Sequence, residues 1–147
     1  MHTLDRVNKS YNARIRKDRT TITHADLTDP DSGDHQDITL KVLPADAILL
    51  SVSFRINTYF TGGTASAVTA AIGVSGDTDS VIAAHNIFDT TVEDVWHTGV
   101  AGVRPHGQHG GETLVARIDI VDDDLVALTA GSLDVEVVYA VPQDESA

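Results

Sequence analysis

The sequence predicts an all-β domain, an antiparallel β-sandwich that fits a jelly roll best, and three observations support this prediction. From about residue 36 onward, apolar and polar residues alternate with a period of two, which is typical of half-buried strands. Clusters of turn-forming residues separate these stretches, and no pair of segments has convincing helical spacing. Among sandwiches, the jelly roll accommodates both a long strand and long crossover loops.

The longest predicted strand covers residues 48–60. Its inward row is apolar except for one threonine, and its outward row is polar. Alternation over about a dozen residues predicts one face in the core and the other in solvent. The inward row is Ile48, Leu50, Val52, Phe54, Ile56, Thr58 and Phe60, opposite Ser51, Ser53, Arg55 and Asn57.

Four further segments have strand patterns. Residues 65–74 are small and β-branched, and the other three segments alternate. Turns are expected at 44–46, 62–63 and 76–79, where proline, glycine and aspartate gather. The inward rows of the alternating segments are Ile38, Leu40 and Val42; Leu114, Ala116, Ile118 and Ile120; and Leu133, Val135, Val137, Tyr139 and Val141.

Two stretches have weaker patterns. Residues 80–96 combine near-helical spacing with residues that disfavour a long helix, so we expect short irregular pieces there. Residues 99–111 are rich in glycine and predict a long surface loop, and loops of that length commonly carry function.

Charge divides the chain into a basic N-terminal segment and an acidic remainder. Residues 1–19 contain six lysines and arginines against two acids, a net charge of +4, whereas four cations face twenty acids in the rest, a net charge of −16. We therefore expect a basic arm over 1–19, a β-sandwich over 20–142 and an acidic tail over 143–147.

The arm supplies the candidate partner-binding residues. Its apolar residues are spaced by three or four, which suits a helix that forms on a partner but is too short to be stable alone. Docking on an acidic neighbour or a sister copy is our favoured interpretation, with a phosphate-binding tail and an inert terminus as alternatives. An acidic body argues against nucleic acid as a partner. The candidates are Arg6, Lys9, Tyr11, Arg14, Ile15, Arg16, Lys17 and Arg19.

Several classes of function have no support in the residues. The chain has no cysteine, no apolar run long enough to span a membrane and no secretory signal pattern, so synthesis in the cytoplasm and no membrane partner are expected. It also lacks a nucleophile elbow, a Ser-x-x-Lys motif and a phosphate-binding glycine loop. We expect no enzyme activity and no cofactor.

Histidines leave one enzymatic alternative open. His106 and His109 lie close in sequence within the glycine-rich stretch, and His97 precedes it, so a cupin-like metal enzyme is the least favoured of our hypotheses. The His-x-His and glutamate pattern of cupins is missing. Acidic clusters at 29–34, 77–79 and 122–124 are interpreted as turn residues on a solvated face, with weak binding of hard cations as the alternative.

Three turn-and-strand motifs resemble those of tailed-phage virion proteins. They are the stretch from Val42 to Val52, which contains Leu43-Pro44-Ala45-Asp46-Ala47; Ile72-Gly73-Val74 followed by Gly76-Asp77-Thr78-Asp79; and the stretch from Leu128 to Tyr139, which opens Leu-Thr-Ala-Gly-Ser. Asp46 stands where those proteins usually have glycine. The resemblance spans about residues 36–141 and is to jelly-roll capsid decoration, or cement, proteins.

The resemblance implies a structural role in a virion. Proteins of this kind typically form trimers on the outside of the capsid, bind the major capsid protein across its lattice and stabilise the expanded shell. An alternative within the virion is a tail, neck or fibre-tip adhesion protein built on the same sandwich, in which Trp96 would be the only tryptophan available for a sugar.

Overall fold

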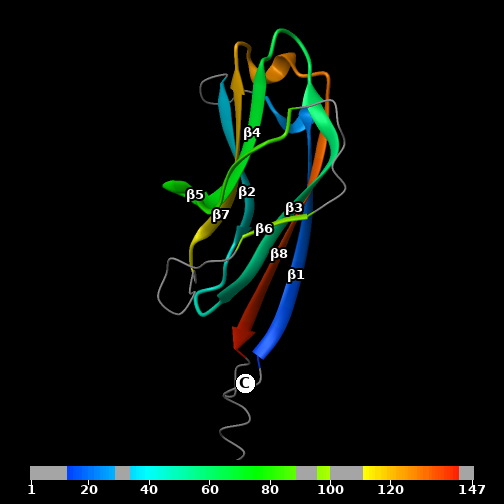
Figure 1. The fold of residues 1–147 in the computed structure, drawn as a ribbon. Coiled ribbons are helices and arrows are strands. Elements are labelled where there is room, and N and C mark those ends of the chain that lie inside the picture. The colour runs from blue at the N-terminus through cyan, green and yellow to red at the C-terminus, as the bar shows by residue number, and fades with distance from the viewer. Residues whose placement is uncertain (1–12, 29–33, 89–95, 100–110, 143–147) are drawn as a thin grey trace, which may run out of the picture.

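The structure is a computed structural model that describes residues 13–28, 34–88, 96–99 and 111–142 of the chain. Within these residues, eight strands form two antiparallel sheets that pack face to face (Figure 1). The β1 sheet has the order β1 (Ala13–Thr23), β8 (Ala130–Pro142), β3 (Ile48–Thr61) and β6 (Trp96–Gly99). The β2 sheet has the order β2 (His35–Val42), β7 (Thr113–Val121), β4 (Ala67–Val74) and β5 (Asp77–Asn86).

This strand order is that of a jelly roll. The chain crosses from one sheet to the other at every connection between described strands except the β4–β5 hairpin, which stays in the β2 sheet. All the strand pairs are antiparallel. The prediction of an antiparallel β-sandwich with jelly-roll topology is therefore confirmed.

One core fills the space between the two sheets. The inward rows predicted for β7 and β8 are confirmed from Leu114 to Ile120 and from Leu133 to Tyr139, because these alternate residues are at most 5% exposed. In both strands the period of two continues without interruption. The largest fully buried side chains are Phe54, Phe60, Ile22, Leu43, Ile56, Ile72, Ile87, Leu114, Ile118, Leu125 and Leu133.

Four predicted inward residues do not face the core, and β-bulges explain them: Ile48, Leu50 and Thr58 in β3, where Thr58 is exposed beyond a further shift after Ile56, and Val42 in β2. In β3 the pairing with β8 shifts between Leu49 and Ser51, so Leu49 is buried and Leu50 is 42% exposed. In β2 the pairing with β7 shifts between Thr39 and Lys41, and Val42 is 60% exposed. An extra residue in one strand reverses the facing of the residues beyond it, which alternation alone does not reveal.

The expectation of irregular structure from residue 80 is wrong as far as Asn86, because β5 runs from Asp77 to Asn86. Its pairing with β4 is interrupted by register shifts, and this irregularity masks the strand pattern in the sequence. The turn that begins β5 is at Ser75 and Gly76, one residue earlier than predicted. Residues 89–95 and most of the predicted loop over 99–111 lie outside the described residues.

The described part of the predicted basic arm is a strand. Residues 13–19 belong to β1, which pairs with β8 over eleven consecutive residues from Ala13↔Pro142 to Thr23↔Ser132 without a register shift. The structure thus differs from the predicted boundary at residue 19. Backbone hydrogen bonds to β8 hold this segment, so it needs no apolar row of its own. Residues 1–12 and the predicted tail over 143–147 lie outside the described residues.

Among the described residues, two short 3-10 helices, η1 (His24–Asp26) and η3 (Leu125–Ala127), connect strands at the end of the sandwich opposite the beginning of β1 and the end of β8. In the part of the chain that the structure describes, no helix has the length and apolar character needed to cross a membrane.

Candidate interaction surface

Apolar side chains are exposed at the end of the sandwich where β1 begins and β8 ends, here called the terminal end (Figure 1). Ile15 on β1 is 60% exposed and Leu50 on β3 is 42% exposed. Register places Ile15, Ala140 and Ile48 side by side across β1, β8 and β3. These residues form an apolar strip on the outer face of the β1 sheet, and such strips on a small protein often mark an interaction site.

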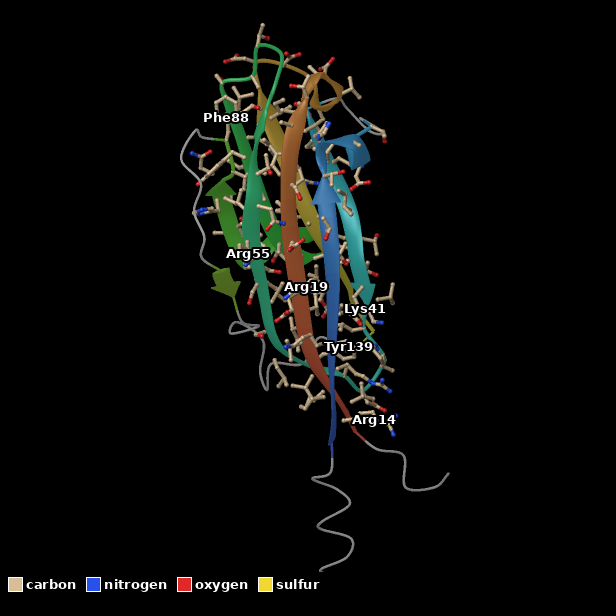
Figure 2. All side chains as sticks on the ribbon, turned by 90° about the vertical axis from the view of Figure 1, so that its right-hand side faces the viewer. Arg14, Arg19, Lys41, Arg55, Phe88 and Tyr139 are labelled. Carbon is tan, nitrogen blue, oxygen red and sulfur yellow. The ribbon has the colours of Figure 1, made fainter. Side chains whose placement is uncertain are left out.

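Polar groups close the gap between the two sheets at the same end. Lys41 of β2 lies 3.1 Å from the Asp18 carboxylate of β1, and its ammonium group lies 5.6 Å from the centre of the Tyr139 ring (Figure 2). The neighbouring Asp18 carboxylate, and after it Tyr139, raises the pKa of Lys41. The bulge in β2 turns Lys41 toward this gap, and the lysine links the edges of the two sheets.

The four cations of β1 are divided equally between the two faces of its sheet. Lys17 and Arg19 lie on the outer face and contact Glu136 of β8, at 3.8 and 3.0 Å. Arg14 and Arg16 lie opposite Val141 and Tyr139, on the side that faces the other sheet. Both are exposed, and neither forms an ion pair with another described residue. β1 therefore has cationic groups open to a partner at its beginning.

Farther from the terminal end, β8 neutralises the outer face of the sheet. Asp134 accepts a hydrogen bond from Thr21 at 2.7 Å and lies 3.8 Å from the Arg55 guanidinium. Burial alone would raise the pKa of Asp134, but hydrogen bonds from Thr21 and Asn57 and the charges of Arg19 and Arg55 lower it overall. This half of the face is internally paired, in contrast to the terminal end.

The structure brings five of the predicted partner-binding residues together on one strand and leaves the others unplaced. Arg14, Ile15, Arg16, Lys17 and Arg19 all lie on β1, an edge strand, and not on a helix. The remaining three, which are Arg6, Lys9 and Tyr11, lie outside the described residues.

The sequence pattern predicts the wrong facing for several residues of the terminal end. It places Leu50 and Val42 in the core and Lys41 in solvent, whereas Leu50 and Val42 are exposed and Lys41 points toward Asp18 and Tyr139. Each of these depends on a bulge, for which the sequence carries no glycine or proline signal at the site.

The predicted metal hypotheses find little to build on among the described residues. His97 lies in β6, whereas His106 and His109 lie outside the described residues, so this trio stays a prediction. In the described ranges, no group of three or more histidine, aspartate and glutamate side chains is arranged to hold a metal ion.

One predicted acidic cluster serves as turn chemistry. The Asp123 carboxylate accepts hydrogen bonds from the backbone and hydroxyl of Thr64, at 2.6 and 3.1 Å. These bonds, led by the one from the Thr64 backbone, lower the pKa of Asp123. The carboxylate thereby ties the β3–β4 turn to the β7–β8 connection, as the turn interpretation predicts.

A hollow of about 340 Å³ opens between the edges of β1 and β2, lined by residues of 20–22 and 36–38 together with Asp26. Its polar groups already have structural partners. The Gln36 amide donates to the backbone oxygen of Asp26 and accepts from the backbone of Thr28, and Asp37 pairs with Arg117. The hollow is therefore a seam between the two sheets, held by internal hydrogen bonds.

The fold is that of known capsid components. A chain of the cyanophage Pam1 capsid asymmetric unit is similar with a TM-score of 0.60 and 18% identity, over 90% of this chain and 88% of that chain. A chain of the capsid of Ralstonia phage GP4 is similar with a TM-score of 0.55 and 15% identity, over 89% and 86%. At these identities the likeness concerns the fold. No protein-family model matches the sequence, and no curated protein matches it.

Proposed function

We propose that this chain is a structural protein of a tailed-phage virion that binds the outer surface of the major capsid protein lattice and stabilises the expanded capsid. The observation that carries the proposal is the end-to-end match to chains of two phage capsids. Each match covers nearly nine-tenths of both chains, so the correspondence extends over the whole sandwich. The turn motifs quoted from the sequence support the same role.

The terminal end is the proposed attachment surface. It combines the exposed apolar side chains of Ile15 and Leu50 with the exposed cation Lys17 on the same outer face, while the body of the chain is acidic. An apolar strip beside charge is a common composition for a protein interface. Residues 1–12 precede β1 in the sequence, and we propose that Arg6, Lys9 and Tyr11 bind a neighbouring subunit.

Binding of this kind stabilises a shell through two effects. A ligand that binds the assembled lattice and not its dissociated subunits shifts the equilibrium toward assembly. Weak contacts that are repeated within one oligomer add up through a high effective concentration. We propose a homotrimer, synthesised in the host cytoplasm and located on the capsid exterior, with no enzymatic role and no nucleic acid partner.

Co-sedimentation with expanded shells that lack this protein tests the proposal. Wild-type protein should pellet with the shells, and Ile15→Asp should reduce the bound fraction at least tenfold, since a charge would enter an apolar contact. The matched control is Val126→Asp, because Val126 is also 60% exposed but lies in η3 at the opposite end.

Failure of the wild-type protein to bind expanded shells would overturn the proposal. Binding to purified host-surface glycans in place of shells would overturn it in favour of a tail or fibre-tip protein. Equal loss of binding in Ile15→Asp and Val126→Asp would show that the terminal end is not the attachment surface.

A further inference from the structure

The edge of the sandwich opposite β1 is acidic. β5 is the last strand of the β2 sheet, whereas β1 is the first strand of the β1 sheet, and Figure 2 places them on opposite sides of the molecule. Asp77 and Asp79 of β5 are exposed, and neither forms an ion pair with another described residue. The molecule therefore has a basic edge, defined by Arg14, Arg16, Lys17 and Arg19, and an acidic edge, defined by Asp77 and Asp79.

The start of β5 projects from the sheet (Figure 1). Between the pairs Val74↔Asp77 and Ile72↔Ile82, β5 advances by five residues while β4 advances by two. The surplus residues bulge out of the ladder and their backbone folds over Gly73 of β4, and bulges of this kind re-aim side chains and interrupt an edge. The acidic edge thus offers charged side chains on a protruding hairpin, and not a flat backbone edge for a strand to join.

Strand register sets the two edges at the same level along the molecule. Pairing across the β2 sheet aligns Lys41 with Leu114, Leu114 with Val74, and Val74 with Asp77. Lys41 also lies 3.1 Å from Asp18, the acid between the cations of β1. Asp77 on one edge is therefore level with the centre of the basic segment on the other.

We propose that the basic edge of one copy of this chain binds the acidic edge of the next copy. This inference deepens the proposed function, because it rests on the proposed trimer and supplies its interface. Contacts between two basic edges or between two acidic edges place like charges together, which disfavours a two-fold dimer through either edge. Contact between unlike edges is head-to-tail, and such contacts close into a ring when the rotation allows it.

The alignment of Asp77 with the basic segment favours a closed ring of copies. A neighbour placed by rotation about an axis parallel to the strands, with no shift along that axis, brings Asp77 and Asp79 opposite Arg16 and its neighbours. A contact that required a shift would build a helix and not a ring. In such a ring the terminal ends of all copies face the same way, so the whole assembly presents one attachment surface.

Arg14 and Arg16 are the cations available for this contact. Lys17 and Arg19 already lie beside Glu136 on the outer face of their sheet, whereas Arg14 and Arg16 have no ion-pair partner among the described residues. Exposed ion pairs are individually weak and screened by salt. The ring should therefore form at low ionic strength and dissociate as salt is added.

Sedimentation velocity of charge-reversed proteins tests the inference. At an ionic strength of about 0.01 M, where the Debye length is about 30 Å, wild-type protein should form a closed oligomer. The double variants Arg14→Glu/Arg16→Glu and Asp77→Lys/Asp79→Lys should each be monomeric, and the variant that carries all four substitutions should recover the oligomer. Asp46→Lys/Asp124→Lys is the matched control, because it changes the charge equally at exposed acids on neither edge.

A wild-type protein that stays monomeric under these conditions overturns the inference. So does a variant with all four substitutions that stays monomeric although its circular dichroism spectrum shows a native fold. The shell-binding assay separates the two proposals. A wild-type monomer that binds shells rejects the edge-to-edge contact and the proposed trimer but keeps the proposed binding to the capsid. An oligomer that does not bind shells keeps the edge-to-edge contact and rejects the binding to the capsid.

Discussion

Gly131 controls how closely the beginning of β8 approaches the core. Its φ is +147°, and a Cβ atom at this position would lie 2.3 Å from the ring of Phe60. Phe60 is fully buried, so the ring has little room to move. A side chain here would meet both an unfavourable backbone conformation and a steric clash.

The predicted result for Gly131→Ala is a loss of unfolding free energy of about 2–5 kcal/mol, combining backbone strain with overpacking. Urea unfolding followed by tryptophan fluorescence measures it. Gly76→Ala is the control, because Gly76 also has a positive φ of +94° but nothing lies within 4 Å of its Cβ position. Equal losses in the two variants would show that the Phe60 contact is unimportant.

Asp37 and Arg117 form a two-pronged ion pair on the outer face of the β2 sheet, with distances of 2.7 and 3.0 Å. The hydrogen bond from Arg117 lowers the pKa of Asp37 below its usual value of 3.8. A carboxyl group with a lowered pKa in the folded state stabilises the protein above its usual pKa. That stabilisation disappears as the pH falls through the lowered value.

Replacing Asp37 with asparagine should therefore cost about 0.5–1 kcal/mol of unfolding free energy at pH 7, a value that allows for solvent screening of this half-exposed pair. The same replacement should cost less at about pH 2, because the stabilisation diminishes progressively as the pH falls below the usual pKa and through the lowered one. Urea unfolding at both pH values measures the difference. The control is the exposed Asp46→Asn, and a cost for Asp37→Asn that does not change with pH would contradict the assignment.

At the scale of elements, β1 is an edge strand that carries four of the six lysines and arginines of residues 1–19. Its eleven uninterrupted pairs with β8 make it a structural part of the sandwich, although its sequence looks like a polar arm. Ile22 at its far end is fully buried, which anchors the strand to the core. The end of β1 near Ile22 thus stabilises the fold, whereas the end near Ile15 is exposed and available to a partner.

Truncation distinguishes a strand from an arm. Removing residues 1–12 should leave the melting temperature unchanged, because β1 begins at Ala13. Removing residues 1–19 should lower it by at least 10 °C, since seven of the eleven paired residues of β1 are lost and the edge of β8 is uncovered. Differential scanning calorimetry of both proteins measures the effect. Equal melting temperatures of the two truncated proteins would show that residues 13–19 do not stabilise the sandwich, as the predicted arm over 1–19 requires.

Period-two patterns predicted the strands well where pairing is continuous and poorly where it is not. β7 and β8 have continuous inward rows, and their core residues were found from alternation alone. The facing of Leu50 and Val42 was not found, because bulges arise from how two strands are fitted together in space. The exposed residues of the terminal end are therefore largely those that sequence patterns assigned wrongly.

At the scale of the whole molecule, the separation of charge has a geometric form. The sequence shows a basic segment and an acidic remainder, and this much follows from counting residues. Only the fold places the basic segment on one edge and Asp77 and Asp79 on the opposite edge at the same level. Because that arrangement depends on tertiary register, no local pattern could predict it.

The central claim is that this sandwich attaches to the outside of a phage shell through its terminal end. Electron cryo-microscopy of expanded shells incubated with the purified protein tests it most directly. The account predicts added density on the outer surface that fits the jelly roll, with Ala13 and Pro142 nearest the shell. Bare shells, or density whose closest contacts to the shell come from η1 and η3, would contradict it.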